Sequence, residues 1–185
     1  MGFAIAEELA DQGAEVILVS GPVSVTTHNE KIFVSRVESA VEMYQSCIKY
    51  FPECDGAVMT AAVADFTPEK YESQKKKRGS KTFTLNLIPT KDIAATLGQM
   101  KKENQILVGF ALESNDEIKN AKKKIVNKNL DFVVLNSLND EGTGFGKNTN
   151  KITIIDKYNV QKAYKLKTKR EVAADIVIKI ITLIR

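Results

Sequence analysis

The chain has 185 residues, of which 43% are hydrophobic and 27% charged, with two cysteines and one histidine. This size and composition fit one domain with its own core and exclude a disordered or fibrous chain. Cysteines 47 and 54 lack metal-ligand spacing, and no apolar run approaches the roughly 20 residues of a membrane span. We therefore expect a single domain over residues 1–185 of a cytoplasmic protein without a membrane partner.

Helical and strand patterns alternate along the chain. In order, they predict a helix at 2–12, strands at 15–20 and 32–35, a helix at 37–51 and a strand at 56–64. They then predict a strand at 82–87, a helix at 92–100, a strand at 106–111, a helix at 116–128, strands at 132–135 and 152–155, and a helix at 168–184. Such alternation is typical of an α/β fold with a doubly wound, mostly parallel sheet of the Rossmann-like kind.

The first predicted helix has no strand before it. In a doubly wound fold the first strand and a glycine-rich turn precede the first helix, whose N-terminus then binds phosphate. We therefore expect that residues 1–185 lack this strand and loop. The alternatives are that a later strand takes its place or that the helix packs on an edge of the sheet.

The excess charge of the chain lies in one short stretch. The chain carries a net charge of +4, and the basic segment at residues 69–81, with six basic and two acidic side chains, carries the same net charge. A nucleic-acid binder would spread its basic residues over a face, whereas a focused cluster suits a small, dense anion such as a triphosphate. A solvated surface loop is the alternative reading of the charge alone.

Four segments are expected beyond the carboxyl ends of the strands, where open parallel sheets bind ligands. They are residues 20–22, 59–66, the basic segment and 109–113. In these segments Asp65 could supply a carboxylate, a lysine at a loop tip could neutralise phosphate charge, and Phe110 could stack on a base. A surface aspartate beside close packing, a solvated loop and a core phenylalanine are the respective alternatives.

Two later patterns bear on anion binding. Lys124 and Lys128 are four residues apart and share a helix face, where they could bind one anion, although a solvated lysine face is the alternative. Glycines 142, 144 and 146 lack the preceding strand and following helix of a dinucleotide fingerprint. The sequence therefore offers no NAD(P) fingerprint at these glycines.

Seven motifs in this order resemble the phosphopantothenoylcysteine synthetase family, the synthetase domain of bifunctional coenzyme A biosynthesis flavoproteins. The motifs are MGFAIAEELADQGAEVILVSGPVS, AAVADF, KKKR ahead of TFTLNL, KDIAATLG, VGFALES, KKIVNKNLD with FVVLN, and GFGKNTNKITIID. The resemblance runs almost without gaps from residue 1 to about residue 156, so it covers most of the chain.

The resemblance implies a ligase that joins 4′-phosphopantothenate to L-cysteine. The substrate carboxylate would attack the α-phosphate of CTP, the nucleotide of most bacterial members, to give an acyl-cytidylate and pyrophosphate. The cysteine amine would then displace CMP. The resemblance also implies Mg²⁺, a homodimer formed partly through the later strand-rich portion, no flavin in this chain and no nucleic-acid partner.

The resemblance assigns roles by position. Lys75 matches the family's catalytic lysine, with Lys76 to Arg78 as the rest of its flap. Asp65 matches a carboxylate that contacts the nucleotide and helps to hold Mg²⁺. The other nucleotide contacts fall on Met59, Thr60, Ala61, Lys91, Asp92, Ile93, Ala94, Phe110, Lys124 and Lys128. At Lys91 the family more often has proline.

One part of the family's active site has no counterpart in these residues. The family carries an asparagine loop followed by a Ser-Ser-Gly-Lys turn immediately before the position of Met1, and the asparagine engages the acyl-nucleotide. The resemblance therefore implies that residues 1–185 alone would be inactive or poorly active. Another Rossmann-like, NAD(P)-dependent enzyme and a non-catalytic nucleotide- or nucleic-acid-binding module stay open as alternatives.

Overall fold

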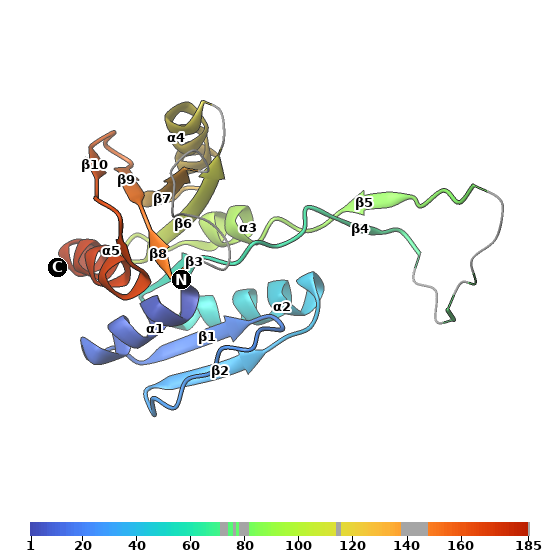
Figure 1. The fold of residues 1–185 in the computed structure, drawn as a ribbon, viewed down its shortest axis with the longest axis horizontal. Helices are drawn as coiled ribbons and strands as arrows, with labels where there is room; N and C mark the ends of the chain where they lie inside the picture. The colour runs from blue at the N-terminus through green and yellow to red at the C-terminus, as the bar shows by residue number, and fades with distance from the viewer. Residues whose placement is uncertain (71–73, 76, 78–81, 114–115, 138–147, 185) are drawn as a thin grey trace.

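The computed structural model describes residues 1–70, 74–75, 77, 82–113, 116–137 and 148–184 (Figure 1). The helices are α1 (Gly2–Asp11), α2 (Ala40–Tyr50), the short 3-10 helix η1 (Phe51–Glu53), α3 (Ile93–Met100), α4 (Glu117–Asn127) and α5 (Lys169–Ile184). The strands are β1 (Val16–Ser20), β2 (Ile32–Arg36), β3 (Gly56–Met59), β4 (Phe66–Pro68), β5 (Leu87–Pro89), β6 (Ile106–Glu113), β7 (Phe132–Ser137), β8 (Thr149–Asn150), β9 (Ile152–Asp156), β10 (Gln161–Ala163) and β11 (Lys167–Thr168).

The main sheet has five strands within the described part of the chain, in the order β10-β9-β7-β6-β3. β3, β6 and β7 run parallel, whereas β9 and β10 add to the other edge in antiparallel pairs. β1 and β2 form a separate parallel pair beneath it in Figure 1. The predicted α/β class with a mostly parallel, Rossmann-like sheet is thereby confirmed.

Helices cover both faces of the main sheet. Because successive side chains of a strand point to opposite faces, Val108 and Val134 pack with α5 and α1, whereas Leu107 and Val133 pack with α3 and α4. These two clusters hold the largest buried side chains, and each face buries aliphatic surface that drives folding. Within the described residues no helix is both long enough and apolar enough to cross a membrane.

The boundaries of two predicted elements move because of local chemistry. α2 begins at Ala40 rather than at residue 37, since the Ser39 hydroxyl accepts the Glu42 amide at 3.2 Å and caps the helix there. The strand predicted at 56–64 ends at Met59, which pairs with Gly109, and the chain then leaves the sheet. Small residues after Met59 extend the apolar pattern without having a partner strand.

β4 and β5 form an antiparallel arm that projects from the body of the molecule (Figure 1). The strand predicted at 82–87 is therefore wrong in its extent, because regular pairing covers Leu87–Pro89, opposite Phe66–Pro68. Alternating Thr, Phe and Leu residues favour a strand, but a strand also needs a hydrogen-bonded neighbour. The Asn86 carbonyl still accepts the Glu69 amide at 3.0 Å, but residues 82–86 are not part of a regular strand.

The strand-rich portion predicted near the C-terminus is present. β10 pairs with β9, and β11 pairs with β8, so short strands surround the start of α5. β8, β10 and β11 could not be predicted from sequence patterns because these strands are short, and such patterns need several alternating residues. The role of this portion in a homodimer stays a prediction.

A buried carboxylate ties together the elements at the amino ends of β6 and β7. Asp131 Oδ2 accepts the Lys101 ammonium at 2.8 Å and the Leu107 amide at 2.8 Å, and Oδ1 accepts Lys157 at 2.9 Å. The side chains of Asp131 and Lys101 are only 8% and 9% exposed. Burial alone would raise the pKa of Asp131, but the bonds from Lys101, Leu107 and Lys157 outweigh it and lower that pKa.

We predict that Asp131→Asn lowers the free energy of unfolding by about 3 kcal/mol near pH 7, because it leaves Lys101 buried without its counter-ion. A lowered folded-state pKa stabilises the fold above the unfolded value of about 3.9, and this stabilisation is lost as pH falls through the folded pKa. Urea unfolding of both proteins should therefore converge at low pH. The exposed Asp11→Asn is the control, and an unchanged difference down to about pH 2 would contradict the account.

Candidate functional site

The base of the arm meets the start of α3. The Thr90 amide donates to the Asp65 carbonyl at 2.9 Å, and the Thr90 hydroxyl donates to the Ala64 carbonyl at 2.7 Å. These two bonds join the outgoing and returning chains of the arm. They hold the exposed Asp65 next to Lys91 and Asp92, so three predicted site residues lie in one corner of the molecule.

Helix α1 begins close to the end of β3. A Cβ added to Gly2 would lie 2.8 Å from the Thr60 Oγ1, so glycine permits this approach. The first N–H groups of a helix have no acceptor within the helix and attract anions. The contact therefore places the start of α1 beside Thr60, at the edge of the sheet where the sequence predicted a nucleotide.

Asp92 caps α3 and pairs with Lys128. Its Oδ1 accepts the Ala95 amide at 3.0 Å, and its Oδ2 lies 2.9 Å from the Lys128 ammonium. Burial alone would raise the pKa of Asp92, but the Ala95 amide and Lys128 outweigh it and lower the pKa below its ordinary value. Asp92 therefore stays ionised near neutral pH and holds the Lys128 ammonium at the start of α3.

The Lys128 side chain runs along α3. The Lys128 carbonyl would be only 2.1 Å from a Cβ on Gly98, while its ammonium reaches Asp92 at the other end of the helix. Gly98 is six positions after Asp92 along the helix, which corresponds to about 9 Å. The side-chain amide nitrogen of Asn129 donates to the Gly98 carbonyl at 2.9 Å. Asn129 has a φ of 50°, the left-handed conformation that commonly ends a helix, so α4 ends where its next residues contact α3.

Lys91 extends the positive charge of the corner. Its ammonium lies 4.7 Å from the ring centroid of Tyr44 on α2, within the range of a cation–π contact. Among the described contacts of this ammonium, the partner is therefore an aromatic ring of α2, while Lys91 itself is next to Asp92 in the chain. Lys124, one helical turn before Lys128, is half-buried on α4.

The remaining predicted contacts differ in their accessibility. Ile93 is 5% exposed and packs in the core with Leu97, so it can meet a ligand only through its backbone. Met59 also packs partly against that cluster, and Ala61 is exposed while Ala94 is half-buried. Phe110 packs against the cluster formed with α5, on the face of the sheet opposite α3. Its predicted base contact would have to form over the edge of the sheet.

The structure does not bring Lys75 to the corner. Lys75 is exposed and lies beyond the bond of 3.0 Å between the Glu69 amide and the Asn86 carbonyl, which joins the two chains of the arm. Glu69 is four positions after Asp65 in extended chain, which corresponds to about 13 Å. Lys76, Arg78 and glycines 142, 144 and 146 lie outside the described residues.

The donors in the corner fit a metal ion that is shared with a ligand. The described residues contain no group of three or more His, Cys, Asp or Glu side chains that could hold a metal alone. Mg²⁺ is commonly held by one or two carboxylates together with substrate phosphates and water. The exposed Asp65 carboxylate is compatible with that kind of site.

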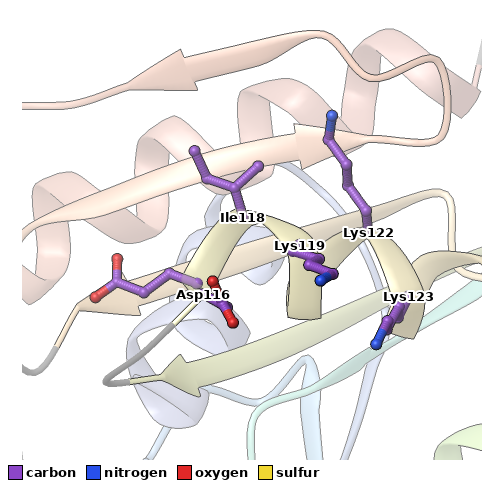
Figure 2. A pocket seen from close by; sticks show the side chains of 6 residues that line it. Asp116, Ile118, Lys119, Lys122 and Lys123 are labelled. Atoms are coloured by element: carbon purple, nitrogen blue, oxygen red, sulfur yellow. The ribbon is translucent and has the colours of Figure 1, made fainter.

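A separate depression of about 780 Å³ lies at the start of α4 (Figure 2). It is lined by Asp116, Glu117, Ile118, Lys119, Lys122 and Lys123. None of the predicted nucleotide residues is among those that line it. The corner around Asp92 is therefore a different surface from this depression.

Sequence reasoning missed Tyr44, Thr90 and Asn129. An asparagine directly after a helix is a known signal for a left-handed end, so Asn129 could have been found. Tyr44 and Thr90 carry no such signal, because their roles depend on contacts with Lys91 and with Ala64 that are 47 and 26 residues away in sequence.

Comparison with known proteins gives a consistent family. A family model described as DNA/pantothenate metabolism flavoprotein C-terminal domain matches residues 1–183. The coenzyme A biosynthesis bifunctional protein CoaBC of Bacillus subtilis (strain 168) is 41% identical over 176 residues, which cover 95% of this chain and 43% of that protein. A crystal structure of the C-terminal domain of CoaBC superposes with a TM-score of 0.82 at 34% identity, over 98% of this chain and 81% of that one.

A further relative carries a different name. A cysteine/cysteine sulfinic acid decarboxylase of an unknown prokaryotic organism is 56% identical over 184 residues, which cover 100% of this chain and 51% of that protein. The chain thus spans about half the length of the curated relatives it matches. The names of these two curated relatives describe whole proteins, and about half of each protein lies outside the matched region.

We predict that Gly98→Ala lowers the free energy of unfolding by about 1–3 kcal/mol. A helical alanine is intrinsically favoured over glycine by about 1 kcal/mol, but here its Cβ would overlap the Lys128 carbonyl and force α3 and α4 apart. Urea unfolding measures the change. The control is Gly21→Ala, whose Cβ would meet the nearest atom, the Met43 methyl, at an ordinary 3.8 Å. Equal stability of Gly98→Ala and wild type would contradict the close approach.

Proposed function

We propose, because the chain belongs to the family of the DNA/pantothenate metabolism flavoprotein C-terminal domain, that it is the phosphopantothenate–cysteine ligase part of a cytoplasmic coenzyme A biosynthesis protein. The 41% identity to Bacillus subtilis CoaBC supports this assignment. The observation that carries it is the corner in which Asp65, Lys91, Asp92 and Lys128 lie together. The relatives favour neither an NAD(P)-dependent enzyme nor a nucleic-acid-binding module.

The proposed reaction has two steps. A carboxylate oxygen of 4′-phosphopantothenate forms a bond to the α-phosphorus of CTP, and the bond to the β-phosphate oxygen breaks, which releases pyrophosphate. The amine of L-cysteine then forms a bond to the acyl carbon, the bond to the phosphate oxygen breaks, and CMP leaves as the amine loses a proton. Both steps bring anions together, so the protein must position them and offset their repulsion.

The residues of the corner suit that demand. Lys91 and Lys128 place two ammonium groups near the start of α3, where they would attract the triphosphate. Asp65 would contact the nucleotide and, with the phosphates, hold Mg²⁺, which when bound shields phosphate charge. Met59, Thr60, Ala61, Ile93, Ala94, Phe110 and Lys124 are proposed as the further nucleotide contacts. Lys75 is proposed to stabilise the charge that develops in the transition state.

We expect Lys75→Gln to lower pyrophosphate release from CTP at least about 100-fold, since it removes a cation that acts on developing charge. The assay requires 4′-phosphopantothenate and cysteine, and ATP is run beside CTP. It uses the chain alone and a longer protein in which the chain follows the segment that precedes the matched region of the Bacillus subtilis relative.

The exposed Lys31→Gln, at the opposite end of β2 from the corner, is the matched control and should leave the rate unchanged. Absence of CTP-dependent turnover from this longer protein would overturn the proposed function. Full activity of Lys75→Gln would overturn only the role of that lysine.

We further infer a homodimer, formed partly through the strand-rich portion β8–β11. The arm supports a second area of contact, because five large apolar side chains on it are between 42% and 59% exposed: Phe66, Phe83, Leu85, Leu87 and Ile88. Apolar side chains gathered on a projecting segment are typical of a surface that another chain covers. A second copy of this chain would bring two such arms together.

Leu85→Glu should shift the protein from dimer toward monomer in sedimentation velocity, because a carboxylate would be buried at the contact between arms. Tyr158→Glu, in the turn between β9 and β10, tests the strand-rich portion in the same way. Val126→Glu is the control, since Val126 is 80% exposed on α4. A wild-type protein that sediments as a monomer at all concentrations would overturn the inferred dimer.

A further inference from the structure

Thr90 lies where the returning chain of the arm rejoins the body. It follows Pro89, which has no amide hydrogen and cannot donate to the facing strand. Thr90 therefore supplies the donors at this point, from its amide to the Asp65 carbonyl at 2.9 Å and from its hydroxyl to the Ala64 carbonyl at 2.7 Å. Both acceptors belong to the outgoing chain just before β4.

The two residues after Thr90 are tied to two other elements. Lys91 contacts Tyr44 on α2, and Asp92 pairs with Lys128 at the end of α4. Three consecutive residues thus connect the base of the arm, α2 and α4. Among the described contacts, the two bonds from Thr90 are those that attach the backbone at Asp65 to residues 90–92. The position of Asp65 relative to Lys91 and Lys128 therefore depends on these bonds.

We propose that Thr90 is a positioning residue that acts through Asp65. Its hydroxyl fixes the backbone of Ala64, and its amide fixes that of Asp65, so the two bonds together set where the Asp65 carboxylate stands relative to the start of α3. Thr90 itself touches no reacting atom in this proposal. The inference rests on the proposed function, because it assigns Thr90 to nucleotide binding at the same corner.

Thr90→Val keeps the size and β-branching of threonine and leaves the amide in place, but it removes the hydroxyl donor. We expect kcat/KM for CTP to fall about tenfold, mainly through a higher KM, since a single hydrogen bond is lost from a group that positions the nucleotide. Thr90→Ser keeps the hydroxyl and should stay within about twofold of wild type. Thr90→Ala repeats the test without the branched side chain, should Thr90→Val fail to fold.

The matched control is Thr182→Val. Thr182 also donates its hydroxyl to a backbone carbonyl at 2.7 Å, that of Lys179, but it lies on α5, away from the corner. The Thr182→Val variant should lose as much stability as the Thr90→Val variant, while its KM for CTP should stay that of the wild type. A rise in KM confined to Thr90→Val separates positioning from a general loss of stability.

A double-mutant cycle tests whether Thr90 acts through Asp65. If it does, Thr90→Val should add little to the loss caused by Asp65→Asn, because the group that it positions has already lost its charge. Losses that multiply in the double variant would overturn the proposal, as would an unchanged KM in Thr90→Val when the wild type is active. Absence of CTP turnover from the longer wild-type protein is a different result, since it overturns the proposed function and the role of Thr90 falls with it.

Discussion

The contact on which the corner depends is the close approach of Lys128 to α3. Gly98 lets the Lys128 carbonyl lie against the helix, and Asp92 receives the ammonium about 9 Å away at the start of the same helix. Backbone packing at one end and an ion pair at the other thus orient one long, flexible side chain. A lysine held in this way loses little further rotational freedom when an anion arrives.

The same ion pair has an electrostatic cost for anion binding. Asp92 places the Lys128 ammonium but also cancels part of its charge, and its lowered pKa keeps it ionised near neutral pH. Attraction for a triphosphate must therefore come from additional cations. In the proposed function Lys91, whose ammonium contacts an aromatic ring, would supply one of them, and the net +4 of residues 69–81 would supply others. Lys91 is thus the corner residue from which most attraction is expected.

The sequence predicted most helices and the buried strands, because long apolar patterns such as residues 106–111 and 132–135 report burial directly. It placed Asp92 among the site residues through a resemblance, and Lys128 through its helix-face spacing with Lys124 as well as the resemblance, without indicating that the two touch. Tyr44 and Thr90 could not be predicted, since their contacts join distant segments. The extent of the strand at 82–87 was wrong because alternation reports which side chains share a face, whereas regular pairing depends on a partner strand.

The central claim is that carboxylate activation occurs by transfer of a nucleotidyl group. Phosphopantothenate labelled with ¹⁸O in its carboxylate tests this most directly, by mass spectrometry of the products of one reaction with CTP and cysteine. The account predicts one ¹⁸O atom in CMP and none in pyrophosphate, because the attacking oxygen stays on the α-phosphorus when the amine displaces CMP. CMP without ¹⁸O, or ¹⁸O that appears in pyrophosphate or in inorganic phosphate, would contradict the account.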